Sequence, residues 1–366
     1  MIPNGFRIGL VGPLPPPSGG MANQTRQLAY LLRQEGVEVE IVQVNAPYRP
    51  QWIRSVRGIR ALFRLAPYVI KVWRVAGRVQ IIHVMANSGW AWHLFAAPAV
   101  WIGWLRRKPV IVNYRGGEAA AFFDRQFRWV SPTLARASAV VVPSTFLKAV
   151  FNKRQVATEI VPNIIDLSRF FPVPRAPSEF HLIVTRNLEE IYDIPTALRA
   201  FAIVKRHFPD AKLTIAGSGP KLADLNGLCE SMGIASAVCF TGRLDNERVA
   251  DLYRLADLML NPSLADNMPI SLLEAMASGV PIVSTRVGGV PYMVKDGIDA
   301  LLVPPGDFAA MASAAIRVLQ DRELALRLAR SGIEAAQRYT WTQVKPRLLS
   351  VYARVLGVDS LSPLAS

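Results

Sequence analysis

The feature that most constrains the fold is an alternation of short apolar runs with helical stretches, which starts near residue 7 and restarts near residue 181. Arg7–Gly12 (RIGLVG) has the character of a short buried strand, and Met21–Gln34 carries leucines at helical spacing before Gly36. Repeated strand–helix alternation predicts a parallel sheet, whose ligands lie at the carboxyl ends of the strands. The chain is therefore predicted to be an α/β protein.

The alternation restarts after a proline-rich stretch, Phe171–Ser178 (FPVPRAPS), in which three prolines stiffen a linker. A chain of 366 residues suits two domains of ordinary size. We predict two Rossmann-like, doubly wound domains facing a cleft, residues 1–170 and 171–340, and a last helix within 341–366 that returns to the first domain. Strands are expected at 7–12, 38–44, 80–85, 110–114, 139–142 and 159–161, and at 181–185, 211–216, 237–241, 257–261, 281–284 and 300–303.

The net charge of +15 is unevenly distributed. Residues 1–170 contain 22 Lys and Arg against 7 Asp and Glu, whereas residues 171–366 contain 20 of each. The whole excess of positive charge therefore lies in the first half. This asymmetry indicates an acidic partner for that half, such as an anionic membrane surface, an anionic acceptor or nucleic acid.

Part of this charge lies in Gln51–Arg78, which has seven basic residues, Trp52 and Trp73, and no acid. Its spacing predicts one or two basic amphipathic helices, broken at Pro67, of the kind that lie on anionic lipid headgroups. A solvated outer helix is the alternative, although such a face normally mixes charges of both signs. Nucleic-acid binding is disfavoured, because the stretch adjoins apolar, Trp-rich segments rather than base-stacking motifs.

Trp90–Leu105 is apolar over about sixteen residues, which is short for a bilayer span of about twenty. A core helix with an aromatic rim is therefore expected. The N-terminus lacks the apolar run of a signal peptide. Cys229 and Cys239 form neither a disulfide framework nor a CxxC metal motif. We expect a cytoplasmic protein, peripheral at the inner face of the membrane.

No metal or other cofactor is expected, because the four histidines are scattered along the chain and are interpreted as structural. They are His83, His93, His181 and His207.

The strongest candidate site is Asn261–Gly279 (NPSLADNMPISLLEAMASG). Asp266 precedes a tight turn, and Glu274 lies in a helix that is expected to have Pro269 at its first position and to end at Gly279. The unpaired amides at a helix start attract phosphate. Two acids around such a start suit a ligand with an anionic middle and hydroxyl-bearing ends, such as a nucleotide sugar. Alternatively, one acid is a local cap and the other a partly exposed helix residue.

A second candidate is Gly19-Gly20, between the first strand and the first helix, where absent side chains let a ligand approach the backbone closely. A plain proline-rich turn explains the loop equally well. Neither GxGxxG nor GxxxxGK[ST] occurs there, so a dinucleotide fingerprint and a P-loop are not supported.

Taken in order, the short motifs resemble those of the retaining GT-B glycosyltransferases of family 4. They are the strand–GG loop, PNIID, RNLEE, IAGSGP, FTGRL, NPS, Asp266-x7-Glu274 and GVPIVST, from Arg7 to Phe308. The resemblance implies transfer of a sugar, with retention of configuration, from a nucleotide-diphosphate sugar to a hydroxyl of a lipid-linked or polysaccharide precursor. The nucleotide sugar is then a co-substrate (UDP-, GDP- or ADP-linked).

The resemblance also implies roles for individual residues. Arg186 would meet the diphosphate, Asp266 the transferred sugar and Glu274 the ribose hydroxyls. The remaining implied donor contacts are Gly19 and Gly20 on the phosphates, Arg243 and Leu244 on the base, and Asn267, Met268, Pro269, Ile270 and Ser271 on the sugar and phosphate. Proline has no N–H, so any amide contact at Pro269 is expected from its neighbours Ile270 and Ser271.

Three positions depart from the family pattern. Tyr192 stands where many relatives have a lysine, Arg115 stands where they often have a histidine, and Asp266 is shorter than the usual glutamate. Arg115 is predicted to bind donor phosphate or an anionic acceptor, or else to replace the missing lysine. Tyr192, at the acceptor or phosphate side, can donate one hydrogen bond but brings no positive charge. These departures leave two other functions open, which are a GT-B-like epimerase or phosphorylase and a non-catalytic protein that binds sugar nucleotide or lipid.

Overall fold

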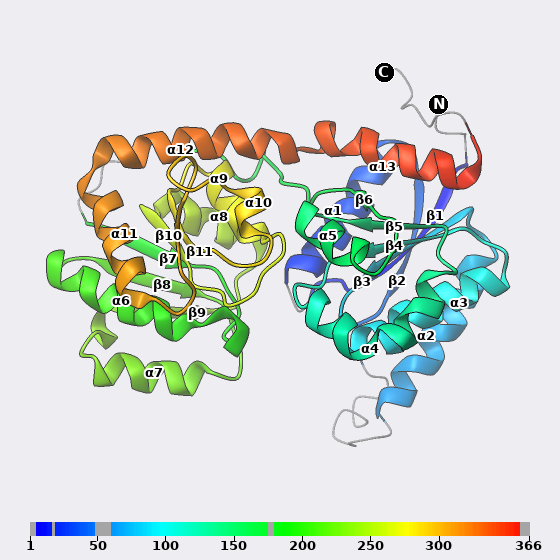
Figure 1. The fold of residues 1–366 in the computed structure, drawn as a ribbon, viewed down its shortest axis with the longest axis horizontal. Coiled ribbons are helices and arrows are strands. Elements are labelled where there is room, and N and C mark those ends of the chain that lie inside the picture. The colour runs from blue at the N-terminus through cyan, green and yellow to red at the C-terminus, as the bar shows by residue number, and fades with distance from the viewer. Residues whose placement is uncertain (1–4, 17–18, 48–59, 175–178, 359–366) are drawn as a thin grey trace. The chain divides into compact units, whose positions relative to one another are not determined.

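The computed structural model of the chain describes residues 5–16, 19–47, 60–174 and 179–358 (Figure 1). The chain forms two compact units, Met1–Pro162 with Val344–Ser366, and Asn163–Gln343. Each unit is built on a six-stranded sheet in which all paired strands are parallel. The predicted α/β class is confirmed, and most strands begin and end within a residue or two of their expected positions.

In the first unit the strand order is β2-β1-β3-β4-β5-β6. The strands are β1 (Arg7–Gly12), β2 (Glu38–Gln43), β3 (Ile81–Ala86), β4 (Val110–Tyr114), β5 (Ala139–Val142) and β6 (Glu159–Ile160). The chain moves outward from β1 to β2 and then returns to place β3 on the other side of β1. In doubly wound sheets, ligands bind where the strand order reverses in this way.

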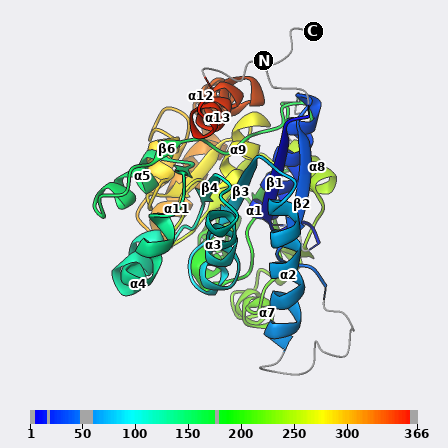
Figure 2. The same ribbon diagram turned by 90° about the vertical axis from the view of Figure 1, so that its right-hand side faces the viewer.

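Helices cover both faces of this sheet. One face packs against α2 (Arg60–Ala76), η2 (Trp92–Ala96), α3 (Ala97–Leu105), α4 (Ala119–Leu134) and α5 (Thr145–Asn152). The other face carries α1 (Gly20–Gln34) and the last helix, α13 (Trp341–Leu356), which belongs to the first unit from Val344 onward. Figures 1 and 2 both show α2, α3 and α4 side by side on one side of the sheet.

The basic stretch differs from its prediction at Pro67, which lies inside a continuous helix α2 instead of breaking it. Pro67 is exposed, so the carbonyl that loses its helical hydrogen bond, that of Phe63, lies on the solvent side and water can satisfy it. Residues 51–59, including Arg54 and Arg57, lie outside the described residues.

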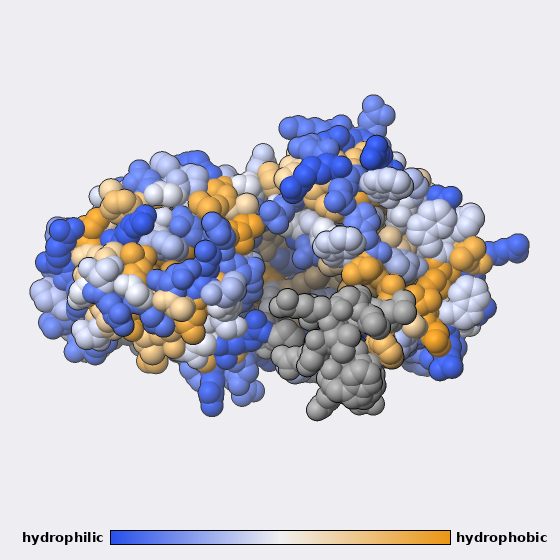
Figure 3. Space-filling view, turned by 90° about the horizontal axis from the view of Figure 1, so that it is seen from below, coloured by the Kyte–Doolittle hydropathy of each residue, from blue (hydrophilic) through white to orange (hydrophobic). Residues whose placement is uncertain are grey.

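The apolar segment Trp90–Leu105 is divided between η2, a π-helix, and α3. Trp92 is fully buried, whereas Trp90 and Trp104 are exposed, so the segment is a core element with an aromatic rim. Within the described ranges, no helix combines the length and apolar character that a bilayer crossing requires. Figure 3 shows apolar (orange) patches among hydrophilic side chains on one face of this unit.

In the second unit the strand order is β12-β11-β10-β7-β8-β9, and it reverses between β7 and β10. The strands are β7 (His181–Val184), β8 (Lys212–Ala216), β9 (Val238–Gly242), β10 (Leu258–Asn261), β11 (Ile282–Thr285) and β12 (Leu301–Val303). One face packs against α6 (Ile194–His207), α7 (Leu222–Ser231), α11 (Phe308–Gln320) and the start of α12 (Arg322–Ala336). The other packs against α8 (Asn246–Leu255), α9 (Ile270–Ala277) and α10 (Val290–Met293).

Candidate functional site

Arg186 lies just beyond β7, at the point where the strand order of the second unit reverses. Its Nε donates to Oδ1 of Asn261, the last residue of the neighbouring β10, at 2.8 Å. Its Nη2 is ion-paired with Asp266, and the two side chains are only 10% and 14% exposed. The sheet topology thus brings together two residues, Arg186 and Asp266, that are predicted to contact one donor molecule.

Tyr192, the residue in place of a lysine, also lies against Arg186. It ends the short 3-10 helix η3 (Glu190–Tyr192), and its ring centroid is 5.1 Å from the guanidinium carbon. The negative face of an aromatic ring attracts a cation. Tyr192 therefore supports the Arg186 guanidinium instead of supplying a second positive charge.

The turn after Asp266 is held by backbone contacts. The Asp266 carboxylate accepts from the amide of Asn267 at 2.9 Å, and the Asp266 carbonyl accepts from the amide of Gly289, also at 2.9 Å. A Cβ atom on Gly289 would lie 1.9 Å from the Asn267 carbonyl oxygen, so no larger residue fits without moving the turn. On the other side, Asn163 Nδ2 donates to the Met268 carbonyl at 2.7 Å.

Helix α9 begins one residue later than predicted. Pro269 has an extended conformation (φ −64°, ψ 122°) and is the N-cap, so Ile270 is the first helical residue. The φ that proline imposes fits both the N-cap and the first helical position. The extended ψ of Pro269 makes it the N-cap. Gly279 ends the helix as predicted, with φ +64°. The hydroxyl of Ser271, at the start of α9, is buried and bonds no other group in the described parts of the chain.

Glu274 lies on α9 and is partly buried. Burial raises its pKa to about 7, although a hydrogen bond from Tyr253 and the charges of Arg186 and Arg169 oppose the shift. The Tyr253 hydroxyl also bonds Thr185 Oγ1 at 2.7 Å and the Ser271 carbonyl at 2.9 Å. Glu274 is thus connected through Tyr253 to the start of its own helix.

The predicted base-reading pair, Arg243 and Leu244, follows β9 at the edge of the sheet. Arg243 is exposed, and Leu244 packs against the hydrophobic core. The pair lies at the same carboxyl edge as Arg186, two strands away from β7, and the cluster against which Leu244 packs includes Met268.

In the first unit, the predicted glycines lie at the corresponding reversal of strand order. Gly19 is the N-cap of α1 in an extended conformation, and Gly20 is the first residue of that helix. No atom of the described residues lies within 4 Å of the place where a Cβ on Gly19 would be. Packing therefore does not demand glycine at this position. A small, mostly apolar hollow beside the reversal is lined by residues that include Val11, Met21, Asn87 and Phe95.

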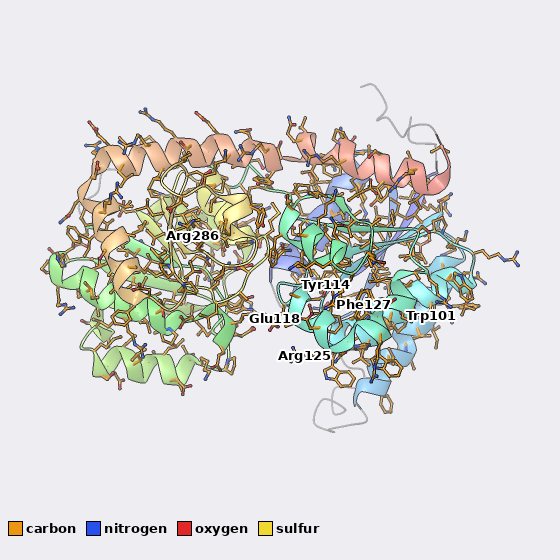
Figure 4. The ribbon with its side chains drawn as sticks, in the orientation of Figure 1. Trp101, Tyr114, Glu118, Arg125, Phe127 and Arg286 are labelled. Atoms are coloured by element: carbon orange, nitrogen blue, oxygen red, sulfur yellow. The ribbon has the colours of Figure 1, made fainter. Side chains whose placement is uncertain are left out.

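Arg115 follows β4 directly after Tyr114, which is labelled in Figure 4 together with Glu118 at the N-cap of α4. Its Nε donates to Asn113 Oδ1 at 3.1 Å. Burial lowers the pKa of Arg115 to about 10, so the guanidinium stays protonated at neutral pH. The predicted residues thus form two groups, one at the carboxyl edge of each sheet.

Sequence reasoning missed the residues that hold these groups in place. Asn261 orients Arg186, Tyr253 contacts Glu274, and Asn163 fixes the turn at Met268. Asn261 and Asn163 do stand within recognised motifs, NPS and PNIID, so a signal existed for them. Tyr253 lies in α8 outside any motif, and only its burial reveals its role.

Comparison with known proteins supports one family. The model of "Glycosyl transferases group 1" matches residues 169–335, and that of "Glycosyltransferase Family 4" matches residues 18–169. A phosphatidyl-myo-inositol mannosyltransferase from Mycobacterium leprae is 24% identical, over 99% of this chain and all of its own length. An N-acetyl-alpha-D-glucosaminyl L-malate synthase from Bacillus anthracis is 30% identical over 60% of this chain and 57% of its own length.

Solved structures show the same fold. A sucrose-phosphate synthase from Thermosynechococcus elongatus superposes with a TM-score of 0.76 at 22% identity, covering 96% of this chain and 99% of its own. HepE from Anabaena, solved in complex with UDP-glucose, gives 0.74 at 18% identity and covers 95% and 99%. Together the two family models cover residues 18–335, which include both groups of residues described above. The chain belongs to the GT-B glycosyltransferases of family 4.

Proposed function

We propose that the protein transfers a sugar from a nucleoside-diphosphate sugar to a hydroxyl of a lipid-linked or polysaccharide precursor, with retention of configuration and without a metal. The observation that carries this proposal is the Arg186–Asn261–Asp266 cluster at the reversal of strand order, next to the start of α9. HepE shares the fold and has been solved in complex with UDP and with UDP-glucose, which supports a nucleotide-sugar donor.

In this proposal the negative charge that grows on the departing diphosphate is stabilised by groups already in place. Arg186 supplies a guanidinium that Asn261 and Tyr192 orient. The amides of Ile270 and Ser271 at the start of α9 supply the positive end of a helix dipole, and the Ser271 hydroxyl is available as a further donor. Glu274 binds the ribose hydroxyls. The leaving phosphate itself helps to deprotonate the acceptor hydroxyl, which attacks from the same face.

The test is a thermal-shift screen of UDP-, GDP- and ADP-sugars, since a ligand that binds the folded state raises the melting temperature. Transfer is then measured with the donor that stabilises most. Glu274→Ala should abolish transfer while the variant remains folded, whereas the matched control Glu334→Ala, at an exposed position on α12, should not change it. Full activity in a folded Glu274→Ala protein would refute the assignment.

We further propose that the first unit contacts an anionic membrane surface through α2, α3 and α4. Arg106 lies 4.8 Å from the ring centroid of Trp73, and Arg136 lies 3.8 Å from that of Trp101 and 4.9 Å from that of Trp104. We call these five residues the aromatic–arginine band; Figure 4 labels Trp101 within it. Arginine and tryptophan side chains each have an apolar part and a polar end. Together they therefore suit the lipid headgroup region, which lies between hydrocarbon and water.

The charges of the first unit favour this partner. Its carboxylates at Glu35, Glu38, Glu40, Asp124 and Glu159 are all ion-paired within the unit. Because residues 1–170 have 22 Lys and Arg against 7 Asp and Glu, many basic residues remain beyond those in these ion pairs, and they attract anionic lipid. Trp73 and Trp104 are 44% and 49% exposed, so their rings are available for contact.

A further inference from the structure

A line of buried polar side chains crosses the sheet of the first unit and ends at Arg115. Asn113 on β4 is 1% exposed, and His83 on β3 and Tyr352 on α13 are fully buried. Arg115 Nε lies 3.1 Å from Asn113 Oδ1, Asn113 Nδ2 lies 3.0 Å from His83 Nε2, and His83 Nδ1 lies 2.8 Å from the Tyr352 hydroxyl. Buried polar groups cost free energy unless they are bonded, and each member of this line has partners within it.

The line has a defined direction because arginine can only donate hydrogen bonds. Arg115 therefore requires the oxygen of the Asn113 amide on its side, which turns the NH₂ group towards His83. Nε2 of His83 must then accept, so the proton of the neutral ring is on Nδ1 and is donated to the Tyr352 hydroxyl. Burial and the charge of Arg115 lower the pKa of His83 to about 3, in agreement with a neutral ring.

Attachment of α13 to the sheet does not by itself explain this arrangement. The Tyr352 ring already packs edge-on against Phe6 and His83, at centroid distances of 6.4 and 5.8 Å, and Lys345 pairs with Glu35 at 3.0 Å. An apolar side chain at position 83 would hold the helix without the cost of burying an imidazole. What the polar line adds is a fixed orientation for the guanidinium at the carboxyl edge of the sheet.

We propose that Asn113, His83 and Tyr352 are positioning residues that orient Arg115 towards a phosphate group of the substrate. The proposal rests on the proposed function, in which the donor, and in a lipid-linked acceptor the acceptor also, carries phosphate. A guanidinium binds phosphate through parallel N–H groups in one plane, so its affinity depends on the orientation of that plane. The hydrogen bond at Nε defines this plane, and α13 thereby acts on Arg115 through three hydrogen bonds.

The kinetic test compares two buried tyrosines, of which only Tyr352 belongs to the hydrogen-bonded line that ends at Arg115. Tyr352→Phe removes the end of the line but keeps the packed ring. The matched control Tyr68→Phe removes another buried hydroxyl of the same unit, which donates to the Phe95 carbonyl at 2.6 Å. Both variants should lose similar thermal stability, but only Tyr352→Phe should raise the KM of the phosphate-bearing substrate, by about tenfold. Equal KM values in the two variants would overturn the proposal.

A double-mutant cycle then locates the effect. Once Arg115→Ala has removed the oriented group, adding Tyr352→Phe should cause no further rise in KM. Additive losses would show that Tyr352 acts on the site by another route and would also overturn the proposal.

A spectroscopic test does not depend on activity. In ¹⁵N NMR of histidine-labelled protein, His83 should show the neutral Nδ1–H tautomer, and Asn113→Leu should change that signal while those of the other three histidines persist. An Nε2–H tautomer in the unmodified protein would refute the direction of the line. If the unmodified protein transfers no sugar but the tautomer is as expected, the proposed function fails while the hydrogen-bonded line stands.

Discussion

Asp266 is ion-paired with Arg186, the residue expected to bind the donor diphosphate. The two side chains lie on loops after adjacent strands, β10 and β7, and the pair is mostly shielded from water. The carboxylate thus contacts the guanidinium that, in the proposed function, binds the diphosphate. In the proposed function, donor binding therefore exchanges one anion for another on Arg186, and this exchange frees Asp266 to contact the sugar.

This exchange predicts opposite effects of Asp266→Asn on two ligands. Without the competing carboxylate, the free nucleoside diphosphate should bind about fivefold more tightly, since a charge-assisted bond no longer has to be broken. Sugar transfer should fall at least about tenfold, because the contact to the sugar is weakened. Calorimetric titration and a transfer assay measure the two effects.

The control for this experiment is Asp251→Asn, which removes an exposed carboxylate paired with Arg254 in the same unit. It should change neither quantity. Weaker binding of the free diphosphate by Asp266→Asn would contradict the exchange.

Substitutions of Tyr192 test whether its aromatic ring holds the Arg186 guanidinium in place. Tyr192→Phe keeps the ring 5.1 Å from the guanidinium carbon and should retain most donor affinity, whereas Tyr192→Leu removes the ring and should weaken donor binding about threefold to tenfold. The comparison is made by titration with the donor identified in the thermal-shift screen. Equal affinities for the Phe and Leu variants would show that stacking does not contribute.

Glu274 should make donor binding depend on pH near neutrality. Burial raises its pKa to about 7, and only the ionised carboxylate accepts hydrogen bonds from both ribose hydroxyls. The dissociation constant of the donor should therefore rise as the pH falls from 8 to 6. Glu274→Gln should bind more weakly at pH 8 and show little change over this range. A pH-independent constant in the unmodified protein would exclude the role.

The same group makes a separate contribution to stability. Its folded-state pKa lies above the ordinary value of 4.5, so folding favours the protonated form. This contribution is full below about pH 4.5 and is lost as the pH rises through 7. Glu274→Gln, which mimics the neutral form, should therefore stabilise the protein more at pH 8 than at pH 5, by about 2 kcal/mol in unfolding free energy.

The fold could be predicted from sequence because its signals are local. Apolar runs such as Val110–Tyr114 and glycine stops such as Gly279 determine strands and helix ends within a few residues. The sequence indicated doubly wound parallel sheets but not the order of the strands within them. The position of each reversal depends on which strands pair, and this is a matter of long-range contacts.

The site was partly predictable for the same reason. Asp266 and Glu274 stand at a recognisable spacing, but their partners Arg186 and Tyr253 are 80 and 21 residues away in sequence from Asp266 and Glu274 respectively. The hydrogen bonds that orient Arg186 come from side chains at the end of β10 and on the loop that follows it. Likewise, nothing local to His83 indicates that it bonds Tyr352 on the last helix.

Gly289 should be required for the turn that carries Asp266. An added methyl group would meet the Asn267 carbonyl at 1.9 Å, so Gly289→Ala must displace the turn. We expect a loss of about 1–3 kcal/mol in unfolding free energy together with weakened donor binding. Chemical denaturation and donor titration measure these effects.

Gly227 provides the control for Gly289, since it lies within α7 and no described atom is within 4 Å of its Cβ position. Gly227→Ala should stabilise the protein by about 0.5–1 kcal/mol, because alanine is the better helix former. Unchanged stability and donor affinity in Gly289→Ala would show that the turn adapts.

The aromatic–arginine band should determine binding to anionic membranes. In flotation with vesicles of phosphatidylcholine and phosphatidylglycerol, binding should require the anionic lipid and weaken as salt is added. Trp73→Ser combined with Trp104→Ser should reduce the bound fraction severalfold, because the exposed rings no longer enter the headgroup region. Leu255→Ser, which removes a 67% exposed apolar side chain from the second unit, should have no effect.

Charge reversal in the basic stretch 51–78 separates membrane contact from catalysis. Arg57→Glu, Arg60→Glu and Arg64→Glu together should release the protein from anionic vesicles, since each basic residue near such a surface contributes about 1 kcal/mol. Transfer to a soluble acceptor should remain largely intact, because none of the three residues is a predicted donor or acceptor contact. Equal binding of the unmodified protein to purely neutral vesicles would contradict an electrostatic attachment and leave the rings as the principal anchor.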